Sequence, residues 1–262
     1  MYFYIYDSFL IDKKYTKFLN QLETRVSDLG ISGKISRLTI LKNATELIQD
    51  FLKNPSPTIV VVGSDKLFYE AAIAMAGSEG VLGFIPLEPS SCLAPLLGLP
   101  ANEFGADVIS ARLIERIRFG KINEKLFCSS IYFPASKTII TCEGAYQIRP
   151  RRIKSIKIVN LDLLKFDKPE ESPDIKRIAS NPKDDFLEVL MGAPARSWWP
   201  FKKKEVRDSL FFAKRIKIES KKPGLEIPMT IDKERVQLIK VPAALRVAEE
   251  SLKIIVGKGR LI

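Results

Sequence analysis

Two short groups of polar residues follow apolar stretches of the chain, at positions suited to binding a ligand. The first group is Gly63-Ser64-Asp65-Lys66, directly after a run of β-branched residues, and the second includes Ser90 and Ser91 after another apolar run. In open α/β sheets, ligands bind beside the turns that follow the carboxyl ends of parallel strands. A helix opening just after Lys66 would also present free N–H groups and a positive dipole end to an anion. The two turns are therefore the first candidates for an anion site.

The composition excludes one broad class of chemistry. The chain has no histidine, which removes histidine-dependent acid/base catalysis, nucleophilic catalysis and metal sites. Its cysteines, Cys92, Cys128 and Cys142, are odd in number and lack metal-ligand spacing, as expected of reduced structural thiols. The formal net charge of +11 predicts attraction to phosphates in nucleotides, anionic lipids or nucleic acid, without choosing among them.

Strands and helices alternate over residues 1–119. The expected strands are 2–6, 35–41, 59–62 and 81–85, and the expected helices lie between Asp12 and Gly30, between Asn43 and Asn54, at 68–76 and at about 102–118. The continuous apolar run at 59–62 is typical of a parallel strand that is covered on both faces. Asn43 followed by Glu46 resembles a capping box. This alternation predicts a doubly wound α/β domain.

From Phe119 onward the pattern changes to short strands separated by irregularly spaced turns. The expected strands are 126–133, 137–142, 145–149, 153–164, 186–191, 213–218 and 235–241. They predict a second, antiparallel domain, with the polar segment 165–182 as a surface excursion. Residues 243–262 begin with helix-compatible Ala and Leu and continue into the apolar Ile254-Ile255-Val256.

The sequence at the two turns resembles the diacylglycerol kinase catalytic family, relatives of NAD kinase. In that family a hydrophobic strand precedes Gly-Gly-Asp-Gly-Thr, and the next strand precedes Pro-Leu-Gly-Thr-Gly-Asn-Asp-Phe-Ala and then Leu-Gly-Ile-Pro. The corresponding residues here are 63–67 (GSDKL), 86–94 (PLEPSSCLA) and 97–100 (LGLP). Residues 182–189 (PKDDFLEV) resemble the family's Pro-x-Asp-Gly-x-Leu-Asp-Val, and 232–234 (DKE) its late Asp-Gly-Glu. These landmarks occur in the family's order and cover nearly the whole chain.

The resemblance implies a two-domain fold of the NAD kinase/diacylglycerol kinase type. Residues 1–119 would form a doubly wound, nucleotide-binding-like α/β domain, and residues 120–242 an antiparallel, β-sandwich-like second domain. Residues 243–262 would return to complete the first domain, with 252–256 packed there.

The activity that the resemblance implies is transfer of the γ-phosphoryl group of ATP, with Mg²⁺, to the hydroxyl of a lipid or other small alcohol. The residues that would hold ATP are Gly63, Ser64, Asp65, Lys66, Ser90 and Ser91. Asp232 or Glu234 would act as general base, and Asp184 would bind a structural magnesium ion. Structural alternatives stay open for each carboxylate: Asp65 as a helix N-cap, Asp184 in a turn, and Asp232 and Glu234 as solvated hairpin residues.

The chain departs from the family at its glycines. Ser64, Lys66, Glu88 and Ser90 stand where the family has glycine, and a non-glycine residue in a left-handed conformation costs roughly 1–2 kcal/mol. Pro89 removes an N–H donor, and Glu88 would place a negative charge beside the nucleotide phosphates, costing on the order of 1–4 kcal/mol. The departures predict a diacylglycerol kinase-like protein with altered or lost phosphoryl transfer. The alternative is an active kinase whose cradle is rebuilt around Lys66 and the Ser90 and Ser91 hydroxyls.

The expected partners are an anionic small molecule or a lipid surface, with no specific nucleic acid. Residues 198–204 (WWPFKKK) place aromatics beside cations, which suits a bilayer interface, although packing on the antiparallel domain explains the aromatics equally. The basic cluster from Arg149 to Lys157 reads as a solvated face. No apolar run approaches the ~20 residues of a membrane span, and the first residues lack the features of a signal peptide, so cytoplasmic residence, peripheral to a membrane, is expected.

Overall fold

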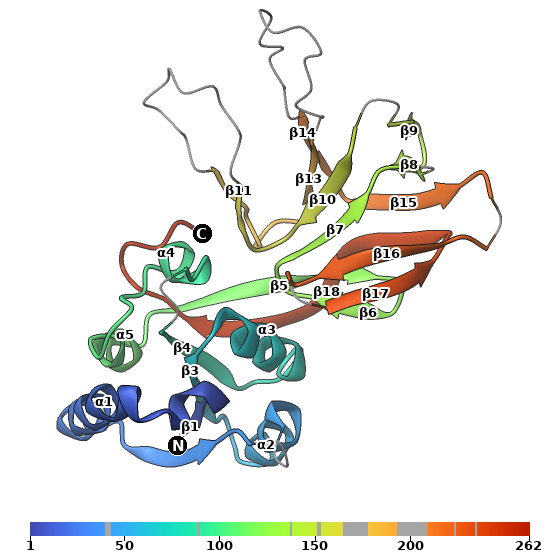
Figure 1. The fold of residues 1–262 in the computed structure, drawn as a ribbon. Helices are drawn as coiled ribbons and strands as arrows, with labels where there is room; N and C mark the ends of the chain where they lie inside the picture. Colours follow the sequence, from blue (N-terminus) through green and yellow to red (C-terminus); the bar gives the residue numbers. More distant parts are fainter. Residues whose placement is uncertain are drawn as a thin grey trace, which may run out of the picture. The chain divides into compact units, whose positions relative to one another are not determined.

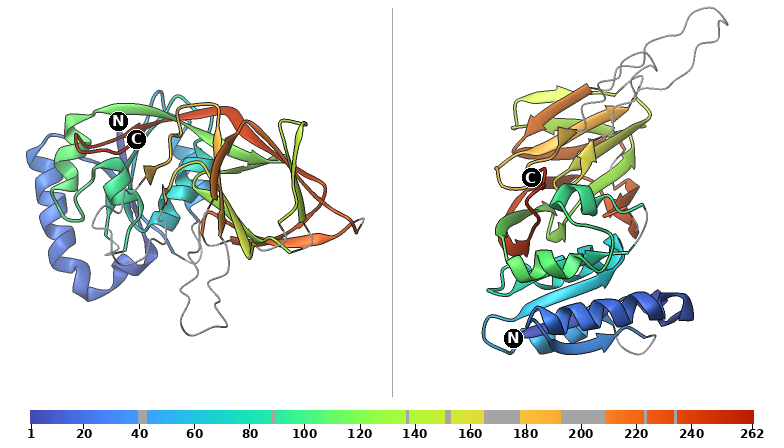
Figure 2. Two further views of the ribbon diagram at one scale, coloured as in Figure 1. Left: turned by 90° about the horizontal axis from the view of Figure 1, so that it is seen from above. Right: turned by 90° about the vertical axis from the view of Figure 1, so that its left-hand side faces the viewer.

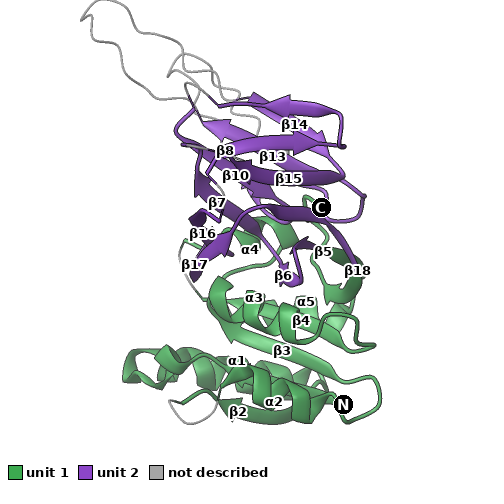
Figure 3. Ribbon diagram, turned by 90° about the vertical axis from the view of Figure 1, so that its right-hand side faces the viewer, with its two compact units in different colours: residues 1–118, 250–262 green, residues 119–249 purple. Residues whose placement is uncertain are grey.

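The chain forms two compact units in the computed structural model. The model describes residues 1–39, 43–87, 90–136, 138–150, 153–164, 178–192, 209–222, 224–233 and 235–262. Unit 1 is Met1–Arg118 with Glu250–Ile262, and unit 2 is Phe119–Glu249 (Figure 3). The sequence analysis places the corresponding boundaries at residues 119 and 243.

Unit 1 is built on a parallel sheet in the order β2-β1-β3-β4-β18. Its strands are β1 (Tyr2–Tyr6), β2 (Gly33–Arg37), β3 (Thr58–Gly63), β4 (Val81–Pro86) and the last residues of β18 (Ala243–Ile255). Lys253 and Ile254 of β18 pair with Val81 and Leu82 of β4, so the C-terminal segment contributes a strand to this sheet. The order reverses direction at β1, which makes the gap between β1 and β3 a topological switch point.

The helices of unit 1 cover both faces of this sheet. They are α1 (Thr16–Asp28), α2 (Ala44–Phe51), α3 (Asp65–Ala74), α4 (Leu93–Leu97) and α5 (Gly105–Ala111), with short 3-10 helices at Ser8–Ile11 and Lys13–Tyr15. Figure 1 shows α1 and α5 on one face and α2 and α3 on the other. The doubly wound α/β prediction is therefore confirmed.

The local sequence explains the central elements. Ile59, Val60, Val61 and Val62 are all 0% exposed, as expected of a strand with helices on both sides. At the start of α2, the side chain of Asn43 accepts a hydrogen bond from the Glu46 N–H at 2.9 Å, in agreement with the predicted cap. Asp12 caps the 3-10 helix Lys13–Tyr15 instead of α1 itself.

Unit 2 consists of antiparallel strands in two layers. One layer is a sheet in the order β14-β13-β10-β7-β16-β17, and the other contains β15, β8, β9 and the first half of β18, with β5 and β6. The strands are β5 (Ile114–Ile122), β6 (Lys125–Phe127), β7 (Ser130–Pro134), β8 (Thr138–Cys142), β9 (Tyr146–Ile148), β10 (Ser155–Val159), β11 (Leu163–Leu164), β12 (Ile178–Ala179), β13 (Leu187–Gly192), β14 (Ser209–Ala213), β15 (Arg215–Ser220), β16 (Glu226–Ile231) and β17 (Arg235–Lys240).

The two layers of unit 2 face each other, as the left view of Figure 2 shows, and the described buried residues of both belong to one hydrophobic cluster. Buried residues from one layer, such as Ile158 and Met229, belong to the same cluster as Ile140 and Ile218 from the other. The alternation of buried and exposed residues along β15 and β16 is the pattern expected of a sandwich with one solvated face per sheet. The antiparallel, β-sandwich-like prediction is therefore confirmed.

Three of the expected strands, 126–133, 153–164 and 213–218, are each interrupted in the structure, and two expectations about helices are wrong. The helix expected at about 102–118 ends at Ala111, because Arg112 adopts a left-handed conformation with φ of 52°, and β5 begins two residues later. The helix-compatible start of the C-terminal stretch is instead the 13-residue strand β18. Its buried residues alternate at Ala243 and Leu245, and this tertiary burial outweighs the helix propensity of Ala and Leu.

No helix within the residues that the structure describes is both long enough and apolar enough to span a bilayer.

The pairing of β18 with β4 predicts that the C-terminal strand carries part of the stability of unit 1. Ile254 is 0% exposed, so Ile254→Ala should lower the free energy of unfolding by about 2–5 kcal/mol, the usual cost of truncating a buried Ile. Ile114→Ala, at a side chain that is 39% exposed, is the matched control and should cost less than about 1 kcal/mol. Urea unfolding measures both, and equal losses would contradict the closure of the sheet by β18.

Candidate functional site

The candidate site of unit 1 lies at the carboxyl ends of its parallel strands. A pocket of about 320 Å³ opens there, beside the switch point between β1 and β3. Its lining comes from the segments after β1, β2 and β3 and from the start of α2: Asp7, Ser8, Leu38, Thr39, Asn43, Ala44, Ser64, Lys66, Leu67 and Glu70. The position is the one where α/β sheets of this topology bind ligands.

The first turn is closed by a bond between Ser64 and Asp7. Ser64 is the N-cap of α3, since its Oγ accepts a hydrogen bond from the Leu67 N–H at 3.3 Å. The same hydroxyl donates to Oδ2 of Asp7 at 2.5 Å, and the Ser64 N–H donates to that oxygen at 3.2 Å. The structural alternative in which Asp65 is the N-cap is thus wrong, because the N-cap is Ser64.

Gly63 is required by the approach of Asp7. Gly63 has φ of +144°, a conformation that L side chains rarely adopt, and a Cβ at this position would collide with the side chain of Asp7. The glycine therefore lets the Asp7 carboxylate reach the turn after β3.

Asp65 ties the first turn to the second. Its side chain is buried, and its carboxylate accepts hydrogen bonds from the Ser91 hydroxyl at 2.5 Å and from the Cys92 and Leu93 N–H groups at 2.8 and 3.3 Å. Ser91 Oγ in turn accepts from the Ala94 N–H at 3.0 Å. Two predicted site residues, Asp65 and Ser91, are therefore in direct contact, but each is directed at the protein.

The protein's own carboxylates occupy the donors that a phosphate would use. Asp7 accepts from the N–H groups of Ser8 and Ser64, and Asp65 from those of Cys92 and Leu93. A phosphate cradle needs such N–H groups to point at the ligand. In this chain the cradle is satisfied internally, and Asp7 is the functional residue that the sequence analysis missed. The only signal in the sequence is an acidic residue directly after the first strand.

The three glycine replacements that the structure describes, Ser64, Lys66 and Ser90, are not in a left-handed conformation. Ser64 has an extended conformation (φ −89°, ψ 156°), and Lys66 lies within the right-handed helix α3. Among the described residues with positive φ, neither these two nor Ser90 occurs. The expected left-handed strain at Ser64, Lys66 and Ser90 is therefore wrong, because the turn has been rebuilt with ordinary backbone conformations. Glu88 and Pro89 lie outside the described residues.

Lys66 is the cation of this pocket. Its side chain is exposed and lines the pocket together with two acids, Asp7 and Glu70. Ser90 is also exposed, in the turn before α4, but it does not line the pocket. Among the described lining residues, acidic side chains outnumber basic ones, which disfavours a polyphosphate.

Asp232, expected as a general base, lies buried in unit 2. Its side chain is 3% exposed and its carboxylate accepts hydrogen bonds from the N–H groups of Cys128 at 3.0 Å and Ser129 at 2.7 Å. Burial raises the pKa of Asp232 above its ordinary value, and the two N–H bonds act in the opposite direction. The reading of Asp232 as a solvated hairpin residue is wrong. Glu234 lies outside the described residues.

The sequence analysis missed Asp162, a carboxylate that pairs with Lys233, the residue after Asp232. It is 1% exposed and forms ion pairs with Lys157 at 2.6 Å and Lys233 at 2.8 Å. Lys233 has φ of 66°, so the left-handed backbone that the family's Asp-Gly-Glu suggests is present here with a lysine. The ion pair with Asp162 holds the tip of that turn.

Asp184, expected to bind magnesium, organises its own turn. One carboxylate oxygen accepts from the Phe186 N–H at 2.9 Å and the other from the Asn181 side-chain amide at 3.1 Å. The part of the chain that the structure describes contains no group of three or more acidic or cysteine side chains placed to hold a metal ion. The residues around Asp184 therefore do not fit a protein-enclosed Mg²⁺ site, which needs several oxygen ligands.

Glu188, in the same landmark, is a buried acid with an unpartnered oxygen. It is 4% exposed; Oε1 accepts from the Asn181 N–H at 3.1 Å, and Oε2 has no hydrogen-bond partner among the described residues. Burial raises the pKa of Glu188 to about 7. The resemblance places Glu188 at the second Asp of the family's Pro-x-Asp-Gly-x-Leu-Asp-Val, but nothing in the sequence indicated that its side chain is buried.

Solved structures with this architecture include a diacylglycerol kinase from Bacillus anthracis str. Sterne. It is 16% identical, with a TM-score of 0.72 over 98% of this chain and 97% of its own. The chain has the diacylglycerol kinase fold. An NAD kinase from Archaeoglobus fulgidus, solved in complex with ATP, is 12% identical, with a TM-score of 0.63 over 100% of this chain and 96% of its own. No family model and no curated protein matches the sequence.

The fold comparison agrees with the order of the sequence landmarks. At these identities it establishes the fold, so the activity has to be argued from the site. The frame of the diacylglycerol kinase fold is present, whereas the turns after β3 and β4 are held together by Asp7 and Asp65.

The environment of Glu188 predicts a pH-dependent stability. The unfolded chain releases this proton near pH 4.5 and the folded chain near pH 7, so its contribution is complete below pH 4.5 and is lost as the pH rises to about 7. Glu188→Gln should therefore gain stability relative to wild type as the pH rises. Between pH 5 and a pH above 7, the difference in unfolding free energy between variant and wild type should shift by on the order of 2–3 kcal/mol in favour of the variant. Urea unfolding across this range measures the difference. Glu226→Gln, at an exposed glutamate of β16, should show no such pH-dependent gain.

Proposed function

We propose that this chain is a diacylglycerol kinase-like protein in which ATP-dependent phosphoryl transfer is altered or lost, while binding of an anionic ligand or membrane surface is retained. The observation that carries the proposal is the internal satisfaction of the two phosphate-binding turns. Asp7 and Asp65 take the N–H donors of Ser64, Cys92 and Leu93. A nucleotide would have to compete with two carboxylates for these groups.

The electrostatic cost of that competition supports weak ATP binding. A negative charge about 4 Å from a phosphate costs roughly 1–4 kcal/mol at dielectric constants between those of water and a protein surface. Since about 1.4 kcal/mol is tenfold in affinity, one carboxylate weakens a micromolar site severalfold to a thousandfold. Lys66 offsets one of the two charges that Asp7 and Glu70 bring to the pocket. At the upper end of that range a micromolar ATP site becomes millimolar, and we expect the ATP affinity of this chain to lie there.

The surroundings of the family's late acidic motif support the same proposal. A general base must reach the proton that it abstracts. The carboxylate of Asp232 is buried and bound to the N–H groups of Cys128 and Ser129, which favours a structural role. In an active enzyme, Glu234 would then be the candidate general base, and the enzyme would use ATP and Mg²⁺.

One observation favours the alternative, an active lipid or small-alcohol kinase. Lys66 lies at the first turn of α3 with its side chain exposed and lining the pocket, where an ammonium group could bind a phosphate in place of backbone N–H groups. In that case phosphate binding would require the Lys66 side chain, whereas a glycine-rich turn binds phosphate through its backbone N–H groups.

Calorimetry with MgATP separates the two proposals. Wild type should bind at millimolar affinity or weaker. Asp7→Asn should bind at least about tenfold more tightly, because it removes one negative charge while its amide oxygen can still accept from one side of the turn. The matched control is Asp50→Asn, an exposed acid paired with Lys53 on α2, which should leave the affinity unchanged.

Other outcomes of that calorimetry contradict the proposal. Micromolar binding by wild type, abolished by Lys66→Gln, would return the active kinase to first place. An Asp7→Asn variant that stays folded and binds no more tightly than wild type would show that the carboxylate does not block the cradle.

The proposed membrane contact rests on the sequence at 198–204, which lies outside the described residues. In co-sedimentation at low salt, wild type should pellet with vesicles rich in anionic lipid and much less with neutral ones. The variant Trp198→Ala, Trp199→Ala should pellet several-fold less. Phe104→Ala, at an aromatic side chain that is 49% exposed in unit 1, is the control and should behave as wild type. If wild type stays in the supernatant with anionic vesicles, membrane binding is rejected.

A further inference from the structure

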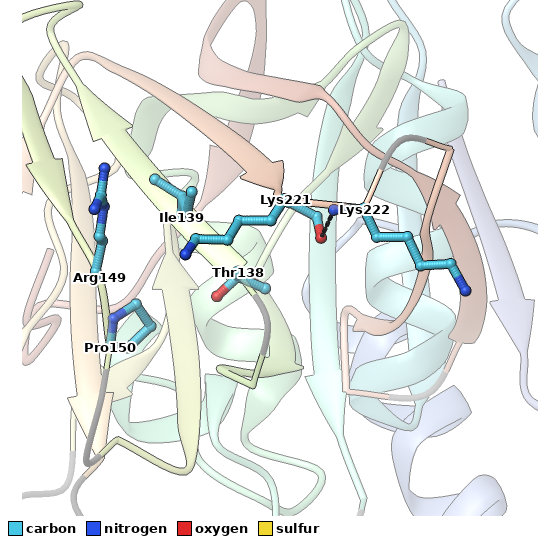
Figure 4. A pocket seen from close by; sticks show the side chains of 7 residues that line it. Thr138, Ile139, Arg149, Pro150, Lys221 and Lys222 are labelled. Atoms are coloured by element: carbon cyan, nitrogen blue, oxygen red, sulfur yellow. Dashed lines mark hydrogen bonds between the residues drawn. The ribbon is translucent and has the colours of Figure 1, made fainter.

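A second pocket, in unit 2, is lined by cations. Its volume is about 480 Å³, and it lies where the first residues of β8, the residues just after β9 and the end of β15 come together. The lining residues are Thr138, Ile139, Arg149, Pro150, Ser220, Lys221 and Lys222, all within unit 2 (Figure 4). The register of the strands explains the assembly, because Ser220 of β15 pairs with Thr138 of β8.

Two of the three cations converge. Figure 4 shows the side chain of Lys221 extending toward Arg149 and Thr138, whereas that of Lys222 points away. Within the residues that the structure describes, Lys221 has no ion-pair partner. Arg149 has only a long contact of 3.5 Å from Nη2 to the Gln147 side-chain oxygen. Two positive groups brought together without a carboxylate repel each other, and an anion between them would remove that repulsion.

The nearest acid along the strands does not neutralise them. Glu219 lies opposite Ile139 in the register of β15 and β8. Its carboxylate is bound to Lys217 at 2.7 Å and accepts a hydrogen bond from the Thr141 hydroxyl at 3.1 Å. These bonds lower the pKa of Glu219, so it stays charged and committed to Lys217. The reading of Arg149 as part of a merely solvated face is therefore incomplete, since it lines a pocket with unneutralised positive charge.

The remaining walls are partly apolar. Ile139 and Pro150 are half-buried and contribute hydrocarbon surface, and the Thr138 hydroxyl is buried and donates to the Ala135 carbonyl at 2.8 Å. A suitable ligand has a doubly charged head for the two cations and an apolar part for Ile139 and Pro150. A phosphate monoester meets both needs, and the planar guanidinium of arginine matches two phosphate oxygens at once.

We propose that this pocket binds the phosphate group of an organic phosphate monoester, with Arg149 and Lys221 on the phosphate and Ile139 and Pro150 against the organic part. The chemistry is shared by a soluble phosphate ester and by a lipid with a phosphate-monoester headgroup. The proposal does not depend on the turns of unit 1, because every lining residue belongs to unit 2.

Titration calorimetry with four probes tests the proposal: inorganic phosphate, glycerol 3-phosphate, dihexanoyl phosphatidic acid as monomers, and dihexanoyl phosphatidylcholine. The two monoester probes should bind more tightly than inorganic phosphate, and phosphatidylcholine should not bind. Affinity should fall as salt is added, because the contacts are between charges near the surface. Tighter binding of the phosphatidic acid than of glycerol 3-phosphate identifies a lipid as the source, and the reverse order identifies a soluble ester.

The variant Arg149→Gln, Lys221→Gln should bind either monoester at least about tenfold more weakly, since it removes both charge-assisted contacts. Lys222→Gln should have a smaller effect because that side chain points away. Lys240→Gln, Lys258→Gln removes the same charge at exposed positions elsewhere and should bind as wild type. Arg149 and Lys221 are themselves exposed, so the test variant should unfold at the temperature of wild type. Unchanged affinity in a folded double variant, equal binding of phosphatidylcholine, or no binding of either monoester overturns the proposal.

Discussion

The requirement that backbone N–H groups at the ends of buried strands find acceptors governs the candidate site of unit 1. In a ligand-binding turn of this topology, such N–H groups are left to bind a phosphate. In this chain the carboxylates of Asp7 and Asp65 accept hydrogen bonds from them. Each carboxylate also takes a serine hydroxyl, Ser64 and Ser91, and each serine caps the turn that follows it. Both turns are therefore complete without a ligand, and the negative charge that a helix N-terminus favours is supplied from within the chain.

This arrangement explains why Ser64 and Lys66 replace glycine in the first turn without left-handed strain. A glycine-rich cradle needs unusual φ values so that the backbone can approach a ligand. With carboxylates as acceptors, Ser64 is extended and Lys66 is helical, and only Gly63 keeps an unusual φ, to admit Asp7. Left-handed strain appears instead at Asp232 and Lys233, where the buried carboxylate of Asp232 and the ion pair of Lys233 hold the turn in place.

The sequence predicts what depends on local pattern and misses what depends on distant partners. The buried residues of β3 and the N-cap at Asn43 are determined by residues close together in the sequence, and both predictions are confirmed. The hydrogen bond between Asp65 and Ser91 joins residues 26 positions apart. The sequence predicts that both residues lie at the site, but it does not show that they bind each other. The helix-compatible start of residues 243–262 forms a strand for a similar reason. Ala and Leu favour a helix locally, but pairing and burial in the sheet decide for β18.

The distribution of charge follows from the same inward use of carboxylates. Asp65, Asp162, Glu188 and Asp232 are all buried. The carboxylates of Asp65 and Asp232 accept from N–H groups or hydroxyls, Asp162 pairs with two lysines, and one oxygen of Glu188 accepts from an N–H group. The formal net charge of +11 already counts these acids, and lysine and arginine heads stay in water at the surface. Arg149 and Lys221 line one pocket with the apolar Ile139, which is the basis for our proposal of an anionic ligand that also carries hydrocarbon.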